Sequence, residues 1–276
     1  MIGQKNLIQD INHLVNTDKF PRFTILTGIQ GSGKKTICKY IGRKLDASVF
    51  FSENKVDDVR EVISNAYKCT GRPCLYVFAD ADNMSPAAKN ALLKVTEEPP
   101  KNAYIIITLV NLNNTYATIR SRGTVMPMNQ YSLTELQEYL STVHPTVNEG
   151  KDILESVCTV PGELDLMIQM GHIDFYNYVG KVVDNIARVS GCNSFKIANA
   201  IKFKDTDEDK YDLRLFWKAF ISICMDRLLE DKQRYTYGIQ VTSKYMQDLN
   251  ITGINKQSTV DCWILAIRRG WMDQKE

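Results

Sequence analysis

Short runs of apolar and β-branched residues alternate with segments of helical periodicity over residues 1–128. The apolar runs predict four strands: Phe23–Thr27, Ser48–Phe51, Cys74–Phe78 and Tyr104–Leu109. The intervening segments predict three helices: Thr36–Leu45, Val56–Ala66 and Pro86–Thr96. Because strands and helices alternate along the chain, we expect a parallel sheet with helices packed on it, which is an α/β domain.

The pattern changes after residue 128. Three short helices are expected there: Ser132–Leu140, Gly150–Cys158 and Glu163–Met170. Helical periodicity then dominates residues 174–276, and its clearest apolar stripe consists of Phe216, Phe220, Ile223 and Leu228. The charged segment 203–212 is predicted to be a loop. We therefore divide the chain into an α/β domain at 1–128, a small helical module at 129–172 and a helical C-terminal domain at 173–276.

The composition is that of an ordinary folded protein, with 276 residues of which 44% are hydrophobic and 24% are charged. The 34 basic residues nearly balance the 32 acidic ones, and the net charge of +2 excludes disorder and a strongly basic protein. No apolar run reaches the ~18 residues that a membrane-spanning helix needs, and the N-terminus does not resemble a signal peptide. We expect a cytoplasmic protein without a membrane partner.

The cysteines and histidines do not favour a metal site. The seven cysteines are widely spaced and form no CxxC pair: Cys38, Cys69, Cys74, Cys158, Cys192, Cys224 and Cys262. This pattern predicts reduced thiols and no zinc site. The three histidines stand in unrelated contexts, and we expect each to be structural or solvated: His13, His144 and His172.

The segment TILTGIQGSGKKT at residues 24–36 predicts a strand that runs into a glycine-rich turn and then a helix. The glycines let backbone N–H groups converge on an anion, and the helix adds its positive N-terminal end. The spacing Gly28-x4-Gly33-Lys34 is that of a P-loop, whose lysine reaches the β- and γ-phosphates of a nucleotide. A plain turn is the alternative. The candidate phosphate-binding residues are Gly28, Gln30, Gly31, Ser32, Gly33, Lys34, Lys35 and Thr36.

One position departs from the P-loop pattern. The residue after the lysine should be Ser or Thr, whose hydroxyl ligates Mg²⁺, but here it is Lys35. Thr36 comes one place later, and because a helix turns about 100° per residue, its side chain points in another direction. The residues therefore favour phosphate binding over metal-assisted hydrolysis.

A second departure follows the strand at 74–78, where an NTPase needs two acids. The first acid holds the Mg²⁺ shell, but this position is Ala79; the second acts on the attacking water, and this position is Asp80. In the alternative register Asp80 serves the metal and Ala81 replaces the base. One carboxylate is missing in either register, so Asp80 is the catalytic candidate, whereas we favour a solvated or capping role for Asp82.

Residues 79–108, ADADNMSPAAKNALLKVTEEPPKNAYIIIT, are similar to a segment of the clamp-loader AAA+ proteins usually written DEADxMxxxAxNALLKxLEEPP. Residues 118–123, TIRSRG, resemble the TIxSRC motif of that family. Residues 2–4, IGQ, resemble its opening motif, and residues 55–61, KVDDVRE, resemble its IDxIRE helix. These motifs are collinear and cover residues 1–128.

The resemblance implies an AAA+ P-loop parallel sheet with helices at 1–128, a small helical lid at 129–172 and an all-helical collar for oligomerisation at 173–276. It is closest to the delta-prime type of subunit of bacterial DNA polymerase III, from a cell or a phage. The implied partners are the motor (gamma/tau) and delta subunits and, through their complex, the sliding clamp and primed DNA. The P-loop can hold ATP or ADP, whereas its residues do not favour Mg²⁺.

Three departures from the motor subunits imply a subunit with little or no ATP hydrolysis of its own: Lys35, Ala79 and Glu163. Glu163 stands where a motor subunit places an arginine on the γ-phosphate, and it would repel a phosphate there. The motor subunits usually also carry a four-cysteine zinc module, but only Cys69 and Cys74 lie in that interval of this chain.

The resemblance gives Arg122 a catalytic role. The arginine of the SRC motif projects into the ATP site of a neighbouring subunit, where an arginine finger stabilises charge on the transferred phosphate. Gly123 replaces the motif's cysteine, which leaves the arginine in place but loosens its support. A helix cap or a solvated side chain is the alternative for Arg122.

Two other functions stay open. The chain could be an active AAA+ ATPase of DNA replication, with Asp80 and Thr36 relocated into working positions. It could also be an AAA+-shaped interaction scaffold without nucleotide turnover. The apolar stripe of Trp263, Ile264 and Ile267 fits an oligomerising surface, and it fits an internal core helix at least as well.

Overall fold

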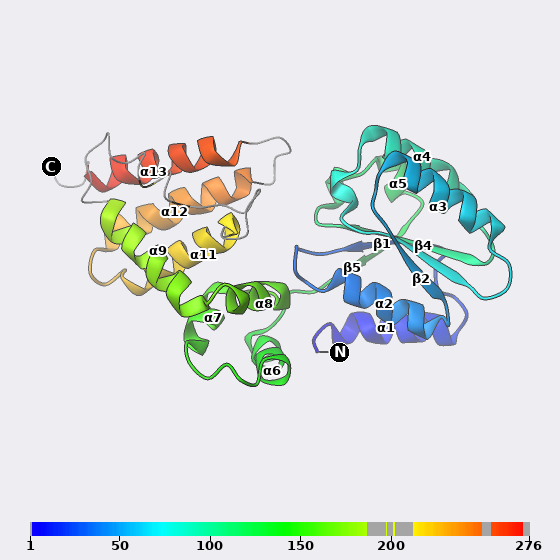
Figure 1. Cartoon of the computed structure of the whole chain (residues 1–276), viewed down its shortest axis with the longest axis horizontal. Helices are drawn as coiled ribbons and strands as arrows, with labels where there is room; N and C mark the ends of the chain where they lie inside the picture. The colour runs from blue at the N-terminus through cyan, green and yellow to red at the C-terminus, as the bar shows by residue number, and fades with distance from the viewer. Residues whose placement is uncertain (1, 187–196, 198–200, 202–211, 250–254, 273–276) are drawn as a thin grey trace. The chain divides into compact units, whose positions relative to one another are not determined.

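A computed structural model of the chain describes residues 2–186, 197, 201, 212–249 and 255–272. Cys192 lies outside these residues, and so does the predicted loop at 203–212 apart from Asp212. The chain divides into two compact units (Figure 1). The first comprises Met1–Tyr139 and Val160–Gly162, and the second comprises Leu140–Thr159 and Glu163–Glu276.

The first unit contains a five-stranded parallel sheet in the order β2-β3-β4-β1-β5. The strands are β1 (Phe23–Thr27), β2 (Ser48–Ser52), β3 (Cys74–Phe78), β4 (Ala103–Leu109) and β5 (Thr124–Pro127). In the register of the central strands, Thr27 pairs with Leu109 and Phe78 with Ile107. Because these strands are parallel, the loops that follow β1 and β3 lie at the same edge of the sheet, on either side of the end of β4.

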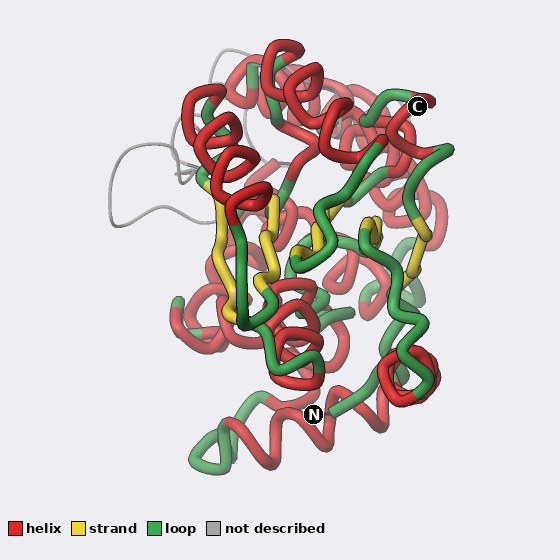
Figure 2. Tube along the Cα trace, turned by 90° about the vertical axis from the view of Figure 1, so that its right-hand side faces the viewer, coloured by secondary structure: helices red, strands yellow, loops and turns green. Residues whose placement is uncertain are grey.

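Helices cover both faces of this sheet. They are α1 (Lys5–Asn16), α2 (Lys34–Lys44), α3 (Val56–Lys68), α4 (Pro86–Glu97) and the short α5 (Ala117–Arg120), with 3₁₀ turns η1 (Ala81–Asn83) and η2 (Leu112–Asn114). Ile11 of α1 and Ile37 of α2 pack with Leu26 on one face. Val59 of α3 and Leu92 of α4 pack with Ile25 on the other. Figure 1 shows these helices on the two sides of the sheet, and Figure 2 shows the strands in yellow between helices in red.

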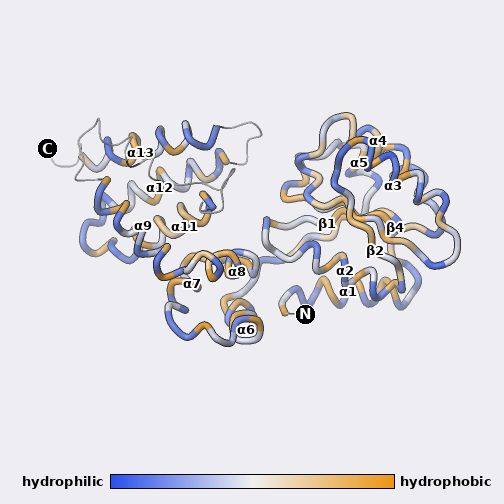
Figure 3. The backbone as a smooth tube through the Cα atoms, in the orientation of Figure 1, coloured by the Kyte–Doolittle hydropathy of each residue, from blue (hydrophilic) through white to orange (hydrophobic). Residues whose placement is uncertain are grey.

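Helix α6 (Leu133–Val143) spans the boundary between the units, and the described part of the second unit is otherwise helical. Its helices are α7 (Lys151–Val157), α8 (Pro161–Gln169), α9 (His172–Ile186), α11 (Leu213–Asp226), α12 (Lys232–Asp248) and α13 (Lys256–Met272). Aromatic side chains form its centre. The rings of Phe216, Phe220 and Trp217 of α11 all pack against the ring of Trp263 of α13. In Figure 3, apolar and polar residues alternate along these helices as amphipathic packing requires.

Two details differ from the expectations for the helical region. Leu228 lies beyond the end of α11, in a turn, and is only partly buried, so it does not extend the stripe of Phe216 and Phe220. Trp263, Ile264 and Ile267 are at most 1% exposed and pack inside the second unit. Of the two interpretations of this stripe, the internal core helix is therefore the one observed, because side chains buried within the chain cannot form a surface for a partner.

The fold class predicted from the sequence is confirmed: the sheet is parallel, and helices lie on both of its faces. The division at 128 and 172 stays a prediction. Within the described part of the chain, we find no helix that combines the length and the apolar character needed to cross a bilayer.

Candidate functional site

The predicted phosphate loop lies between β1 and α2, and its lysine is folded onto the loop itself. Lys34 is 6% exposed, and its ammonium group donates hydrogen bonds to the carbonyl oxygens of Gly28 (2.7 Å) and Ile29 (3.0 Å). Gly31 and Gly33 have φ angles of 81° and 89°, which only glycine adopts without strain. Burial lowers the pKa of Lys34, and the nearby carboxylates of Asp80 and Asp82 partly oppose this shift.

The P-loop packs closely against the first residues of α8 through a contact between two glycines, Gly31 and Gly162. The N–H of Gly162 donates to the carbonyl oxygen of Gly31 over 3.0 Å. A Cβ atom at Gly162 would lie 2.7 Å from the Cα of Gly31, and one at Gly31 would lie 3.2 Å from a methyl group of Val160. The contact between the first turn of α8 and the loop therefore depends on glycine at both positions, because both neighbours are backbone or packed against it.

A second brace comes from the segment after β5. The Tyr131 hydroxyl donates to the carbonyl oxygen of Ser32 over 2.9 Å, and the buried Ser32 hydroxyl lies 3.5 Å from the Met128 sulfur. The side chain of Gln4 bonds to both the N–H and the carbonyl of Asn129, at 2.8 and 2.7 Å. Burial raises the pKa of Tyr131 further above its ordinary value. Tyr131 is not among the residues predicted from the sequence, whereas Gln4 belongs to the IGQ motif at residues 2–4.

Lys35 and Asp80 face one another across the front of the loop. The Lys35 ammonium is 3.8 Å from an Asp80 carboxylate oxygen, and the two side chains are 63% and 50% exposed. Gln30 and Thr36 are exposed as well. The structure thus brings together the loop from Gly28 to Lys35 with Asp80, as the sequence predicts for the edge of a parallel sheet.

The end of β3 presents a methyl group where an acid would be needed. Ala79 is buried, and its carbonyl accepts a hydrogen bond from the Asn54 side chain. Asp80 takes the left-handed conformation with φ 54°, and its N–H donates to the hydroxyl of the buried Thr108 over 2.9 Å. Thr108 at the end of β4 therefore presents a hydroxyl to this turn, and Asp80 places a carboxylate beside the P-loop.

Asp82 has a structural role, as favoured from the sequence. One carboxylate oxygen accepts from the backbone N–H of Val110 at 2.7 Å. The other accepts from the N–H of Asn111 at 3.0 Å and from the Asn114 amide at 3.1 Å. These three bonds fix the turn after β4 and engage both oxygens of Asp82.

Arg122 lies directly after α5 and is held by two groups from the family motifs. Its guanidinium donates to the Thr118 carbonyl and to the Glu97 carboxylate, each over 2.8 Å. The Arg122 side chain is 32% exposed, so the group is oriented but accessible. Gly123 lies against the sheet, where a Cβ would come within 2.6 Å of Ile25 and 2.9 Å of Phe23. Glycine therefore fits a tightly packed site at this position, and its effect on the support of Arg122 stays a prediction.

Glu163 is engaged within the second unit. One oxygen accepts from the Thr159 N–H over 2.8 Å, and the other forms an ion pair with Lys218 in which the side chains are 17% and 20% exposed. Lys218 therefore compensates the charge that was expected to repel a phosphate. The expected loss of an arginine at this position is unaffected.

No cluster of three or more His, Cys, Asp or Glu side chains able to hold a metal occurs among the residues that the structure describes. Two of the cysteines form a pair, in which the thiols of Cys69 and Cys74 lie 2.9 Å apart. The hydrogen bond to Cys74 raises the pKa of Cys69, which favours the protonated thiol. Two thiols are half of a structural zinc site.

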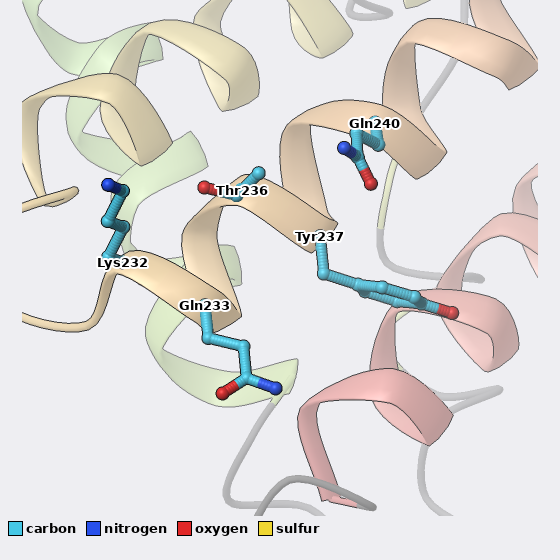
Figure 4. A pocket seen from close by; sticks show the side chains of 5 residues that line it. All are labelled: Lys232, Gln233, Thr236, Tyr237 and Gln240. Carbon is cyan, nitrogen blue, oxygen red and sulfur yellow. The ribbon is translucent and has the colours of Figure 1, made fainter.

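The second unit has a shallow hollow on α12, with a volume of about 430 Å³ (Figure 4). It is lined by Lys232, Gln233, Thr236, Tyr237 and Gln240. All five side chains come from one helix, and none of them belongs to a predicted site. The hollow offers amide and hydroxyl groups and one ammonium group for hydrogen bonding.

The chain is similar to subunits of DNA polymerase III. The family described as "DNA polymerase III, delta subunit" matches residues 46–132. The gamma subunit of Buchnera aphidicola subsp. Schizaphis graminum is 25% identical in an alignment 173 residues long, and the alignment covers 52% of this chain and 48% of that protein. The gamma subunit of Buchnera aphidicola subsp. Acyrthosiphon pisum is 22% identical over 287 residues, covering 89% of this chain and 78% of that protein.

The matched region thus spans about half the length of the first of these relatives. Among solved structures, the RuvB Holliday junction branch migration motor of Thermotoga maritima covers 83% of this chain and 76% of its own, with 14% identity and a TM-score of 0.51. At this identity the likeness shows the fold alone. Together these findings confirm the fold class and the resemblance to AAA+ clamp-loader proteins.

Proposed function

Starting from this resemblance, we propose that the chain is a clamp-loader subunit of the delta-prime type. It acts as a stator in loading the sliding clamp on primed DNA, and it donates Arg122 as an arginine finger to the ATP site of a neighbouring motor subunit. Its own ATP hydrolysis is weak or absent. Residues 129–172 form its lid, and residues 173–276 join the collar of the complex.

The geometry of Arg122 carries this proposal. The guanidinium has five N–H donors, of which the bonds to Thr118 and Glu97 occupy two. Both contacts hold the group in a fixed orientation, and the remaining donors suit the oxygens of a phosphate. An oriented and accessible arginine can stabilise charge on a phosphoryl group without a reorganisation cost at the moment of reaction.

The chain's own loop supports the second half of the proposal. A hydrolysing site needs a metal-binding hydroxyl and two acids, and these positions hold Lys35, Ala79 and Asp80. The Asp80 carboxylate is exposed and lies 3.8 Å from the Lys35 ammonium, where a hydrolysing site would hold a metal. The loop is suited to holding ATP or ADP and not to cleaving it.

The remaining partners follow from the family. The proposed complex contains the gamma/tau motor and delta subunits of DNA polymerase III, and it acts on the sliding clamp and primed DNA. With a net charge of +2, this chain would contribute few backbone phosphate contacts to DNA. The cytoplasm is the expected compartment.

The test is the DNA-stimulated ATPase rate of a loader rebuilt from this chain with motor and delta subunits. Arg122→Ala should reduce that rate by about a hundredfold or more, as expected for removal of an arginine finger. Arg120→Ala is the matched control, because Arg120 lies two residues away and bonds to Asn113 instead. Equal rates for the wild type and Arg122→Ala in an assembled complex would refute the proposed role.

An active ATPase is the second candidate, because the curated relatives are named gamma subunits. It predicts steady ATP turnover by the isolated chain, which would be abolished by Asp80→Asn. If the chain is a stator, the isolated wild type should hydrolyse ATP no faster than the isolated Asp80→Asn variant. An interaction scaffold would fail to assemble with the motor and delta subunits at all, and co-purification distinguishes it from both.

A further inference from the structure

The P-loop region does not offer the ligands that Mg²⁺ requires. A P-loop magnesium ion is held by the hydroxyl after the lysine and by a shell that the strand-end acid positions. Here the first position carries the ammonium of Lys35, and the second is the buried methyl group of Ala79. Both oxygens of Asp82 already accept hydrogen bonds from the turn after β4, so metal binding there would compete with the bonds that hold this turn.

The remaining carboxylate is already paired with a cation. Asp80 lies 3.8 Å from the ammonium of Lys35, so a divalent ion placed on Asp80 would meet a like charge at close range. Mg²⁺ also keeps a rigid octahedral shell of hard oxygen ligands, and an ammonium group is no ligand. The residues present therefore disagree with the metal that the fold family implies.

The same geometry provides positive charge for a phosphate. Lys34 and Lys35 begin α2, whose first N–H groups have no acceptor within the helix. Lys34 is buried and fixed on the loop carbonyls, whereas Lys35 is 63% exposed. Exposed ion pairs contribute little to stability, so Lys35 can turn from Asp80 to a phosphate at small cost.

We propose that this P-loop binds a nucleoside di- or triphosphate as the metal-free anion, with the Lys35 ammonium in place of the divalent cation. The inference rests on the nucleotide-holding loop of the proposed function and adds the chemical form of its ligand. Metal-free binding also explains how one chain can hold a nucleotide without hydrolysing it, since the cation that would act on the terminal phosphate is excluded.

The test is calorimetric titration of the full chain with ADP and with ATP, in EDTA and in excess MgCl₂. The wild type should bind in EDTA, and Mg²⁺ should leave the affinity unchanged or reduce it, because the metal sequesters the free nucleotide. Lys35→Thr should weaken binding in EDTA by about tenfold, the effect of one charge-assisted hydrogen bond. The double variant Lys35→Thr/Ala79→Asp restores both metal-binding positions and should bind more tightly with Mg²⁺ than without it.

The matched control is Lys39→Thr. Lys39 lies one turn further along the same face of α2 and is exposed, so the substitution removes the same charge from the same helix. It should change the affinity by less than about twofold, as expected for a screened charge one turn away. Lys35 and Lys39 are exposed, so both single changes should be tolerated, whereas Ala79 is buried. Thermal unfolding of each variant, and of the double variant above all, shows whether it is folded.

Binding by the wild type only in the presence of Mg²⁺ would overturn the inference, as would equal losses from Lys35→Thr and Lys39→Thr. Failure to bind ADP or ATP in both buffers would also overturn it. That outcome leaves the stator proposal standing, because the Arg122 experiment measures hydrolysis in the neighbouring subunit's site.

Discussion

The P-loop and the region around Arg122 both lie in the first unit and both resemble motifs of one family. They differ in how many of the side chains needed for catalysis they contain. The P-loop has its backbone, its glycines and the buried Lys34, whereas the positions for a metal and an acid hold Lys35 and Ala79. The region around Arg122 has its arginine fixed by Glu97 and Thr118. The comparison teaches that binding a phosphate and cleaving it require different residues. The P-loop of this chain has the residues for binding and lacks those for cleavage.

The largest expected effect comes from the glycine contact behind the P-loop. Gly162→Ala places a Cβ 2.7 Å from the Gly31 Cα, and the neighbour is backbone that cannot rotate away. We expect a loss of about 3 kcal/mol in the free energy of unfolding, at the upper end for overpacking, with displacement of the loop. Urea denaturation measures this loss.

Gly180→Ala is the control for that substitution. Gly180 is in α9, and the nearest atom to an added Cβ is a guanidinium nitrogen of Arg227 at 4.0 Å. The change should be neutral or stabilising by up to about 1 kcal/mol, because alanine favours a helix interior. Equal stability of Gly162→Ala and the wild type would show that Gly162 and Gly31 are not packed as closely as described.

The next effect concerns the support of Arg122. Gly123→Cys restores the residue of the family motif but brings a Cβ within 2.6 Å of Ile25, a fully buried side chain. Because side chains can repack more readily than backbone, we expect about 1–2 kcal/mol of destabilisation. A cysteine that stabilises the chain, measured in the same denaturation experiment, would contradict this packing.

A smaller effect on stability, but a selective one on function, is expected for the Glu97–Arg122 pair. Glu97→Gln should change the free energy of unfolding by less than about 1 kcal/mol, since the pair is partly exposed. The ATPase rate of the rebuilt loader should fall several-fold, because Arg122 loses its orienting anion. Glu98→Gln is the control: it removes the adjacent exposed carboxylate and should leave that rate unchanged.

The thiols give a prediction that separates buried from exposed positions. Burial raises the pKa of Cys38 in α2 to about 12, whereas Cys262 is exposed. The thiolate reacts with alkylating agents, so at pH 8 Cys262 should be labelled in the native state while Cys38 is protected. Mass spectrometry after brief alkylation measures both, and rapid labelling of Cys38 would mean that α2 is not packed as described.

Sequence patterns within a few residues predicted those elements whose ends depend on the local sequence alone. The strands Phe23–Thr27 and Cys74–Phe78 have the predicted ends, because each is a short apolar run bounded by polar or turn residues. The short strand Thr124–Pro127 was not predicted, since its four residues include a proline and it is defined by pairing with β1. Helix α5, with four residues, likewise has no periodicity to detect.

The site shows the same division between local and long-range information. The spacing of Gly28, Gly33 and Lys34 is a local signal, and these residues do form the loop expected. The contact of Tyr131 with Ser32 joins residues 99 positions apart, and that of Arg122 with Glu97 joins residues 25 apart. Contacts of this kind depend on how the sheet and helices pack, so they cannot be predicted from the spacing of residues in the sequence.

The central claim is that this chain acts in a neighbour's site and not in its own. The most direct measurement compares Asp80→Asn with Arg122→Ala in the same rebuilt loader, using the DNA-stimulated ATPase rate. The account predicts that the rate survives Asp80→Asn, which removes the carboxylate beside the P-loop, and that it collapses with Arg122→Ala. Collapse with Asp80→Asn and survival with Arg122→Ala would contradict the account and identify the chain as a motor.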